Sequence, residues 1–510
     1  MSETITANRR IAKNTILLYV RMFFVMIVSL ITVRVLLQKI GVQDYGIYNA
    51  VAGFVTTLAF ISSVLSVASQ RYFSFYIGKG DIIALRKVFS IIIICYIIVA
   101  LLIFFLGETI GLWFVNHKMV YPPERQYAVM WVYQFAILSC ICSIMCSPFQ
   151  AIVISYEDMN IYACIGIVEV LMKLGIIFLL TFLSVDKLIL YSILHCSIFI
   201  VILITYLAIV KRKYKNIRFV LHWDKKGFME IFSYSFWSMF GSVAGLANTQ
   251  GTNILLNLFF GPIANAAYSI SSQVSAAISQ FANSFYTAVR PAIIKSYAQN
   301  QLDQLNYLFY LSCKVLFTLS LLLLLPIACE TNTILNLWLD IVTEEMVVFT
   351  RLSILYTFLL IISNPITAIV QAANKVKSYH LVVDSFTLLS LPVSYVLFRL
   401  SFPSFTAYLV TITFFSIAHL LRLFILKKIM RFSIMYYFIS FVIPAVLTVV
   451  LSYVFSQFFT PDLGSPILNL VCKCFYDSLL IICVCGLLVF SKAERNEVVG
   501  LIVNKIRNKR

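Results

Sequence analysis

The sequence predicts an all-α membrane protein with about fourteen transmembrane helices. Of its 510 residues, 61% are hydrophobic and only 12% are charged, and the mean hydropathy is +0.95. A soluble domain carries about 25% charged residues, so this chain has lipid as its main solvent. Apolar stretches of roughly 20 residues recur along the whole chain. The segments between them are too short to fold as soluble domains.

Each predicted span is an apolar run long enough to cross a hydrocarbon core about 30 Å thick. Their approximate limits are 14–37, 46–77, 88–107, 126–150, 161–183, 188–210, 231–258, 265–289, 306–328, 347–371, 381–398, 405–426, 437–458 and 467–490. The second is long for one crossing, so we expect it to tilt or to extend beyond the bilayer. The polar N-terminal segment before the first run reads as a retained cytoplasmic tail, not as a signal peptide.

The distribution of basic residues predicts the orientation. The net charge is +18, with 39 Lys and Arg. If the N-terminus is cytoplasmic, 26 of these 39 fall in cytoplasmic segments and five in external connections. This asymmetry follows the positive-inside rule, which also returns the basic C-terminus to the cytoplasm. The rule accounts for most of the positive charge, and we expect no nucleic-acid partner.

Two similar segments indicate an internal repeat. Residues 41–48 follow the first span and residues 261–268 follow the seventh, and each begins with Gly and ends with Tyr. A long helix rich in small residues comes next, ending at Arg71 in one case and at Arg290 in the other. An even number of spans per repeat gives both halves the same orientation, which predicts a parallel repeat. Chance similarity between two apolar helices is the alternative.

The repeat predicts the domain organisation. We expect two six-helix lobes, a basic cytoplasmic linker between them, an additional transmembrane hairpin and a basic cytoplasmic tail. Their limits are 1–210 and 229–426 for the lobes, 211–228 for the linker, 437–490 for the hairpin and 491–510 for the tail. Two lobes facing each other across a central cavity are typical of alternating-access transporters.

Three segments carry a resemblance to a known family. They are RRIAKNTILLYVRM at 9–22, GVQDYGIYNAVAG at 41–53 and SVASQRYFSFYIGKGD at 66–81. They resemble polysaccharide-transport flippases of the multidrug/oligosaccharidyl-lipid/polysaccharide (MOP) exporter superfamily, above all O-antigen and lipopolysaccharide exporters of Bacteroides-like bacteria. The resemblance covers the whole chain in topology, while its distinctive residues lie within 9–90.

The resemblance implies a function without covalent chemistry. Such a protein moves undecaprenyl-pyrophosphate-linked oligosaccharide from the cytoplasmic to the periplasmic leaflet of the bacterial inner membrane. The implied partners are the lipid-linked oligosaccharide, membrane lipid, a coupling proton or sodium ion, and polysaccharide assembly proteins; no cofactor is expected. The extra hairpin at 437–490 resembles the lipid II flippase branch, where two added helices form a groove for the lipid tail.

An anionic pyrophosphate inside a membrane requires cations or oriented donors, and arginine suits phosphate best. Arg21, in the first span, is the leading candidate for such a contact. Arg34 lies in the same span but about 220° around the helix, where snorkelling to the interface is the alternative. The lipid II flippases also use arginines in their first, second and eighth helices, a match by helix and not by motif.

Further candidates come from the other charged residues of the spans. Arg71 and Arg290 end equivalent helices, where anchoring by the positive-inside rule explains them equally well. Lys314 has no local partner and is a second-lobe candidate for phosphate or sugar. Lys173 stands four residues after Glu169, so the two share a helix face either as a structural ion pair or as a cavity pair that binds substrate or ion.

Four more spans contain charged or titratable residues. Asp384 is a candidate for ion coupling or an interfacial residue. Lys473 and Asp477 repeat the four-residue spacing, and we expect a structural ion pair there. His195 and His419 are expected to be hydrogen-bonded packing residues.

The sequence also excludes several kinds of site. Its twelve cysteines form no CxxC pair and no cluster with histidine, so neither metal binding nor disulfides are predicted. A phosphate-binding Gly-rich loop and a nucleophile–base–acid arrangement are missing too. We therefore expect no enzyme. The closest alternative functions are a drug/cation antiporter of the same superfamily and, less favoured, a membrane polysaccharide polymerase or glycosyltransferase.

Overall fold

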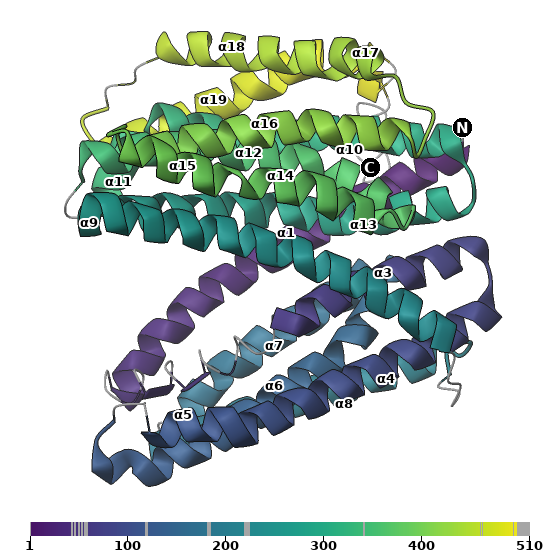
Figure 1. Ribbon diagram of the computed structural model, residues 1–510, viewed down its shortest axis with the longest axis vertical. Helices are drawn as coiled ribbons and strands as arrows, with labels where there is room; N and C mark the ends of the chain where they lie inside the picture. The colour runs from purple at the N-terminus through teal and green to yellow at the C-terminus, as the bar shows by residue number, and fades with distance from the viewer. Residues whose placement is uncertain are drawn as a thin grey trace, which may run out of the picture. The chain divides into compact units, whose positions relative to one another are not determined.

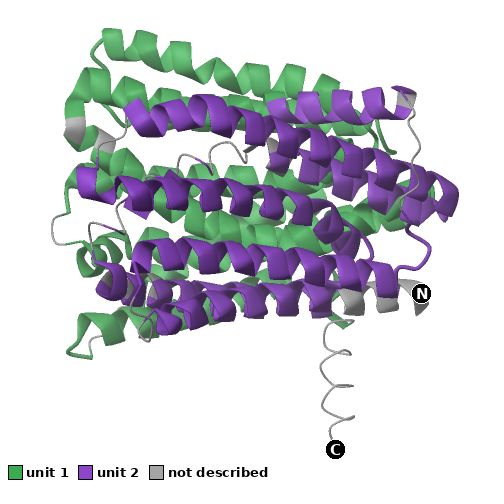
Figure 2. Ribbon diagram, turned by 90° about the horizontal axis from the view of Figure 1, so that it is seen from below, with its two compact units in different colours: residues 1–9, 240–510 green, residues 10–239 purple. Residues whose placement is uncertain are grey.

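A computed structural model describes residues 2–41, 44, 47–48, 51–52, 55, 60–117, 121–180, 185–218, 225–339, 342–459, 461, 463–492 and 494–496. Every secondary-structure element in this part of the chain is a helix (Figure 1). The helices form two compact units (Figure 2). One comprises Arg10–Met239, and the other comprises Met1–Arg9 with Phe240–Arg510. We call Arg10–Met239, purple in Figure 2 and unit 2 in its key, the first unit, and the green remainder, unit 1 in the key, the second unit.

The first unit contains long helices that run from one end of the unit to the other. A π-helical turn, Gly107–Gly111, joins α4 to α5, and a 3₁₀ turn, Pro123–Arg125, precedes α6. The helices are α1 (Ser2–Ile40), α3 (Phe60–Lys79), α4 (Ile82–Leu106), α5 (Leu112–His117), α6 (Gln126–Ser155), α7 (Met159–Leu179), α8 (Lys187–Lys213) and the start of α9 (Lys225–Ala298).

The second unit contains the rest of α9 and all later helices. π-helical turns at His380–Asp384 and Phe438–Val442 interrupt two of its spans. Its helices are α10 (Leu302–Cys329), α11 (Thr331–Trp338), α12 (Glu344–Ala372), α13 (Val376–Tyr379), α14 (Ser385–Leu388), α15 (Ser390–Arg399), α16 (Thr406–Lys427), α17 (Ile434–Tyr437), α18 (Ile443–Gln457) and α19 (Pro466–Leu488).

Eleven helical segments among the described residues are long and apolar enough to cross a membrane. They coincide with eleven of the predicted spans. The other three predicted spans are 46–77, part of which lies outside the described residues, and 231–258 with 265–289, which fall within α9. The all-α membrane fold is therefore confirmed, whereas the total of fourteen spans remains a prediction.

Contacts in the first unit group the connections at two opposite ends. At one end, Arg125 forms ion pairs with Asp44 and with Asp186, and its Nη1 lies 2.5 Å from Asp186 Oδ2. Three connections predicted to be external thus meet at one arginine.

At the other end, segments predicted to be cytoplasmic meet one another. Asn14 donates to the carbonyl of Glu157 at 3.2 Å, and Arg86 donates to the carbonyl of Asn216 at 2.5 Å. This grouping agrees with the alternating up-and-down topology on which the orientation was predicted.

The backbone supports the predicted repeat at three pairs of positions. Residues with positive φ recur 220 positions apart at Gly41 (83°) and Gly261 (78°), and again at Gly80 (70°) and Asn300 (55°). The φ values of Glu157 (62°) and Asn374 (57°), 217 positions apart, form a third pair. Left-handed residues of this kind commonly terminate helices, so equivalent helices of the two halves break at equivalent places. Gly261 is the break inside α9 between the seventh and eighth predicted spans.

Two equivalent helices form the centres of the units. α6 packs against α3, α4, α7 and α8, while α12 packs against α10, α11 and α16. Both contain the pattern Pro-x-x-Ala-Ile-Val, at 148–153 and at 365–370. The alanine and the two residues after it are buried in both helices, so the matching segments lie in the core of each unit. The predicted domain limits remain a prediction, since the boundary between the compact units falls within α9.

Candidate functional site

Arg21 lies in α1 and faces α7. Its guanidinium is centred 4.4 Å from the ring centroid of Tyr162, a favourable cation–π arrangement. Gly166 provides the space for it, because a Cβ at that position would lie 2.9 Å from Cζ and Nη2 of Arg21. The Nε of Arg21 is buried and has no hydrogen-bond partner among the described residues. Arg21 is therefore held by packing against Tyr162, and its Nε donor is not used.

Glu169 and Lys173 continue the same face of α7. Their ion pair is 2.7 Å long, and the Lys173 ammonium also lies 5.1 Å from the ring centroid of Phe199 in α8. Tyr206 of α8 is close enough to interact electrostatically with both Arg21 and Glu169. The first unit thus brings three sequence-predicted site residues together along α7, with one carboxylate already neutralised by its lysine.

His195 lies beside this group in α8. Its Nδ1 is 3.4 Å from the hydroxyl of Tyr48, and its ring packs edge-on against Phe199 with centroids 5.2 Å apart. This environment agrees with the predicted hydrogen-bonded packing role.

Arg71 is buried near the end of α3, with only 4% of its surface exposed. Its guanidinium lies over the rings of Tyr72, Phe75 and Tyr234, at 4.4, 5.2 and 5.5 Å from their centroids. Tyr72 in turn donates to Glu230 Oε1 at 3.2 Å. Contacts to Glu230 and Tyr234 connect the end of α3 to the first turns of α9.

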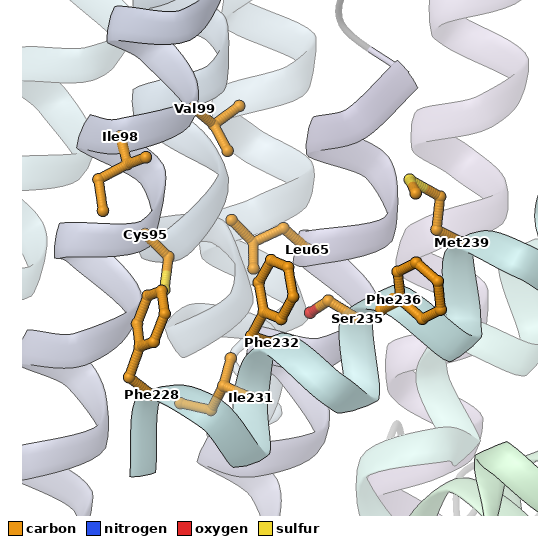
Figure 3. Close-up of a pocket in the computed structure, with 10 residues that line it drawn as sticks. All are labelled: Leu65, Cys95, Ile98, Val99, Phe228, Ile231, Phe232, Ser235, Phe236 and Met239. Carbon is orange, nitrogen blue, oxygen red and sulfur yellow. The ribbon is translucent and has the colours of Figure 1, made fainter. Parts of the chain in front are cut away.

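An apolar pocket lies between α3, α4 and the same turns of α9 (Figure 3). Its volume is about 180 Å³, and nine of its ten lining residues are apolar. Side chains of α9 such as Phe232 point toward Leu65 and Cys95 on the opposite wall (Figure 3). Leu65 precedes Arg71 by six residues, which places the pocket about 9 Å further along α3. Phe232 is 55% exposed, so the pocket opens at the surface of the unit.

The second unit pairs Lys314 with an acidic side chain. Lys314 forms a 2.7 Å ion pair with Glu494, and both side chains are about nine-tenths buried. The sequence showed no local partner for Lys314, because the glutamate lies 180 residues away. Arg290 is also buried, at 6% exposure, near the end of α9. For Arg34 only the backbone is described, within α1, and its proposed role lies outside the described side chains.

Asp384 lies in the π-helical turn of the eleventh predicted span. His380 Nδ1 is 2.5 Å from Asp384 Oδ2, and the pair packs against Gly241 of α9, where a Cβ would lie 2.6 Å from that oxygen. π-Helical turns are frequent at functional sites. The contact therefore keeps Asp384 a candidate for ion coupling and adds His380 to it.

The expected ion pair between Lys473 and Asp477 is wrong. Lys473 instead binds Glu330, with Nζ 2.6 Å from Oε1, because the glutamate at the end of α10 faces α19. Burial raises the pKa of Glu330, but hydrogen bonds from Lys473 and Thr333 and the charge of Lys473 outweigh it, so the pKa lies below its ordinary value. This ion pair attaches the C-terminal hairpin to α10.

Comparisons with known proteins identify the family. The model of the family described as polysaccharide biosynthesis protein matches residues 11–297. The chain belongs to the polysaccharide biosynthesis protein family. A search of curated proteins found no match.

Solved structures show the same fold. Over 82% of this chain and 95% of the other, it is similar to an outward-facing multidrug resistance MATE family transporter of the MOP superfamily (13% identity, TM-score 0.66). The chain is similar to a MOP superfamily transporter from Pyrococcus furiosus, with 12% identity, a TM-score of 0.67 and the same coverage. That transporter is described as having a binding pocket of reversed polarity. The chain is also similar to the MATE transporter ClbM, with 14% identity and a TM-score of 0.65 over 83% of this chain and 95% of the other.

This member of the polysaccharide biosynthesis protein family is thus a multi-pass membrane protein with the fold of these transporters. Identities of 12–14% carry the fold alone. The cargo must therefore be argued from the side chains of this chain.

Sequence reasoning missed one buried charge of this protein. Arg422 of α16, 4% exposed, donates to Tyr379 at 3.0 Å and to Ser363 at 3.0 Å. The same serine contacts His419 Nδ1 at 3.2 Å, and Tyr437 contacts its Nε2 at 3.3 Å. The spacing of His419 and Arg422, three residues on one helix face, was the available signal. Arg422 was overlooked because it stands where a positive-inside arginine is expected.

Proposed function

We propose that this transporter is a flippase for undecaprenyl-pyrophosphate-linked oligosaccharide, such as an O-antigen unit. It moves the lipid from the cytoplasmic to the periplasmic leaflet of a bacterial inner membrane by alternating access. The family match and the transporter fold support this proposal at the level of the protein class. The substrate is proposed from the side chains of the first unit.

One observation carries the proposal: α3 carries a buried arginine and, about 9 Å along its axis, one wall of a pocket that is almost wholly apolar. Arg71 supplies a permanent positive charge suited to phosphate, and the neighbouring pocket suits hydrocarbon. A pocket of about 180 Å³ exceeds the roughly 150 Å³ of an apolar cavity that holds benzene. It has room for one stretch of a prenyl chain, the remainder of which stays in the bilayer. Charge and pocket together match the two chemical parts of a polyprenyl pyrophosphate.

Arg21 favours an anionic cargo by its surroundings. Its Nε is buried without a described partner, and the nearby carboxylate of Glu169 is already bound to Lys173 at 2.7 Å. A partly buried cation with an unused buried donor stabilises an incoming anion. We infer that Arg21 contacts the pyrophosphate during translocation, after Arg71 has received the lipid from the cytoplasmic leaflet. Lys173, Arg290 and Lys314 remain weaker candidates, since the first and last already have carboxylate partners.

The alternative is a drug/cation antiporter, which requires a carboxylate available to a cation. The lysine on Glu169 argues against that role in the first unit, while the Asp384–His380 pair keeps ion coupling open in the second. Among the described residues of the first unit, no arrangement favours polymerase or glycosyltransferase chemistry over transport.

The test is transport by the purified protein in proteoliposomes. The substrate is a fluorescent polyprenyl-pyrophosphate disaccharide, and a membrane-impermeant glycosidase reports how much of it has reached the opposite leaflet. Loss of a hydrogen bond to a charged group costs about 1.5–3 kcal/mol, so Arg71→Ala should slow transport roughly 10- to 100-fold. Arg71→Lys retains the charge without the guanidinium fork and should fall between Ala and the unsubstituted protein.

Arg399→Ala is the matched control. Arg399 also packs over aromatic rings, at 5.5 Å from Tyr395 and 6.0 Å from Phe259, but it is exposed at the end of α15. Its loss should leave transport unchanged. Equal transport by the Arg71→Ala and Arg399→Ala proteins would remove the proposed headgroup site. If the protein takes up a drug in exchange for a cation and does not move the glycolipid, the proposed function is wrong and the protein is an antiporter.

A further inference from the structure

A second cleft in the first unit combines an apolar wall with three basic residues. It lies between α4, α6 and α8 and has a volume of about 820 Å³. Phe89, Phe149 and Leu207 are among its apolar lining residues. Lys211, Lys215 and Arg218 line it where α8 ends, and all three are exposed. The cleft thus has a hydrocarbon-like interior and a positively charged rim.

The rim is held in place by neighbouring contacts. Tyr214 ends α8 and stacks on Tyr156, with ring centroids 4.6 Å apart, and its hydroxyl donates to Asp158 at 2.5 Å. Beyond it, the carbonyl of Asn216 accepts a hydrogen bond from Arg86 at 2.5 Å. The turn that carries Lys215 and Arg218 is therefore attached to two other helix ends. A fixed turn loses little conformational freedom when its cations bind a ligand.

The rim cations have no carboxylate partner within the described chain. Asp158 is the nearby acid, and it is bound to Lys213 at 2.7 Å as well as to Tyr214. Among the residues that the structure describes, the ion pairs include none for Lys211, Lys215 or Arg218. The three positive charges at the rim suit an anionic group, and the apolar interior suits a hydrocarbon chain.

We propose that this cleft binds an anionic phospholipid of the surrounding membrane. Its phosphate lies on Lys211, Lys215 and Arg218, and one acyl chain lies between α4, α6 and α8. Basic pockets between transmembrane helices on the cytoplasmic side bind anionic headgroups, and the predicted orientation places this rim on that side. The bound lipid fixes the end of α8 against α4 and α6, so it stabilises the first unit.

This site is distinct from the pocket beside Arg71. The pocket uses Cys95 and Ile98 of α4, whereas the cleft uses Phe89 and Ile93. At 100° per residue, Ile93 and Cys95 point about 200° apart, so the two sites use different faces of α4. The inference therefore does not depend on the identity of the transported substrate.

The experiment measures lipid binding to the purified, delipidated full chain by native mass spectrometry and by its melting temperature. Dioleoyl-phosphatidylglycerol is compared with dioleoyl-phosphatidylcholine, which has the same chains, and with glycerol phosphate, which has none. We expect binding and a higher melting temperature with phosphatidylglycerol alone. At about a fivefold contribution per basic residue, replacing all three by glutamine should weaken this binding roughly 100-fold. Leu207→Trp, which fills the apolar wall and keeps the cations, should weaken it as well.

The matched control carries Arg212→Gln, Lys225→Gln and Lys428→Gln. It removes the same charge from exposed positions that do not line the cleft, and its binding should change less than threefold. Equal losses in the two triple variants would overturn the proposal, because net charge would then explain the binding. Equal binding of glycerol phosphate or phosphatidylcholine would overturn it too. Displacement of phosphatidylglycerol by a hundredfold lower concentration of polyprenyl phosphate would assign the cleft to the substrate instead.

Discussion

Gly166→Ala tests the position of Arg21 without removing its charge. The new methyl would lie 2.9 Å from Cζ and Nη2 of Arg21, and the flexible guanidinium must move off Tyr162. The lost cation–π contact costs about 0.5–2 kcal/mol. Replacing glycine by alanine inside a helix contributes about 1 kcal/mol in the opposite direction. We therefore expect stability within about 1 kcal/mol of the unsubstituted protein and transport reduced at least tenfold.

The assay is the proteoliposome measurement described above, combined with melting temperatures in detergent. Gly175→Ala is the matched control on the same helix, because nothing lies within 4 Å of a Cβ there. It should gain the same helix stability and transport normally. Gly166→Ala and Arg21→Ala act on one group, so their combination should be no worse than Arg21→Ala alone. If the two losses instead multiply, Gly166 does not act through Arg21 and the reasoning is refuted.

Two further predictions concern ion pairs of the second unit. Glu330→Gln should lower stability at pH 7 by about 1.5–3 kcal/mol. Because the pKa of Glu330 is depressed, its ion pair stabilises the protein above the ordinary glutamate pKa of about 4.3. This stabilisation is lost as the pH falls toward the folded-state pKa. Melting temperatures from pH 7 to pH 3.5 should thus fall less steeply for Glu330→Gln than for the unsubstituted protein, and parallel curves would contradict this. Asp384→Asn removes the charge beside His380. It should abolish the dependence of transport on a pH or sodium gradient, while substrate exchange without a gradient continues. Transport in proteoliposomes with and without an imposed gradient measures both effects. Unchanged gradient dependence would exclude Asp384 as the coupling group.

The fold was predictable from the sequence because its main determinants are local. A run of about 20 apolar residues has one stable solution in a membrane, a helix that pairs its own backbone groups. The eleven described spans consequently coincide with predicted ones. The breaks at Gly41 and Gly261 were also visible, since the backbone there needs a residue that adopts positive φ.

The ion pairs were only partly predictable. Glu169 and Lys173 bind each other as their spacing suggested, because both sit on one helix and four residues make about one turn. The same argument failed for Lys473, whose partner Glu330 lies on another helix. Spacing places two side chains on one face, but it does not say what that face packs against.

By itself, the amino-acid sequence determined that the protein lies in a lipid bilayer, where its membrane helices are and to which family it belongs. Hydropathy and short motifs depend on one segment at a time. Only the tertiary structure decided the surroundings of each charge: the glycine that makes room for Arg21, the glutamate that neutralises Lys314, and the apolar pocket beside Arg71. Those surroundings depend on how each helix is rotated about its axis and which helix it meets. Such contacts join residues up to 180 positions apart, and no local pattern records them.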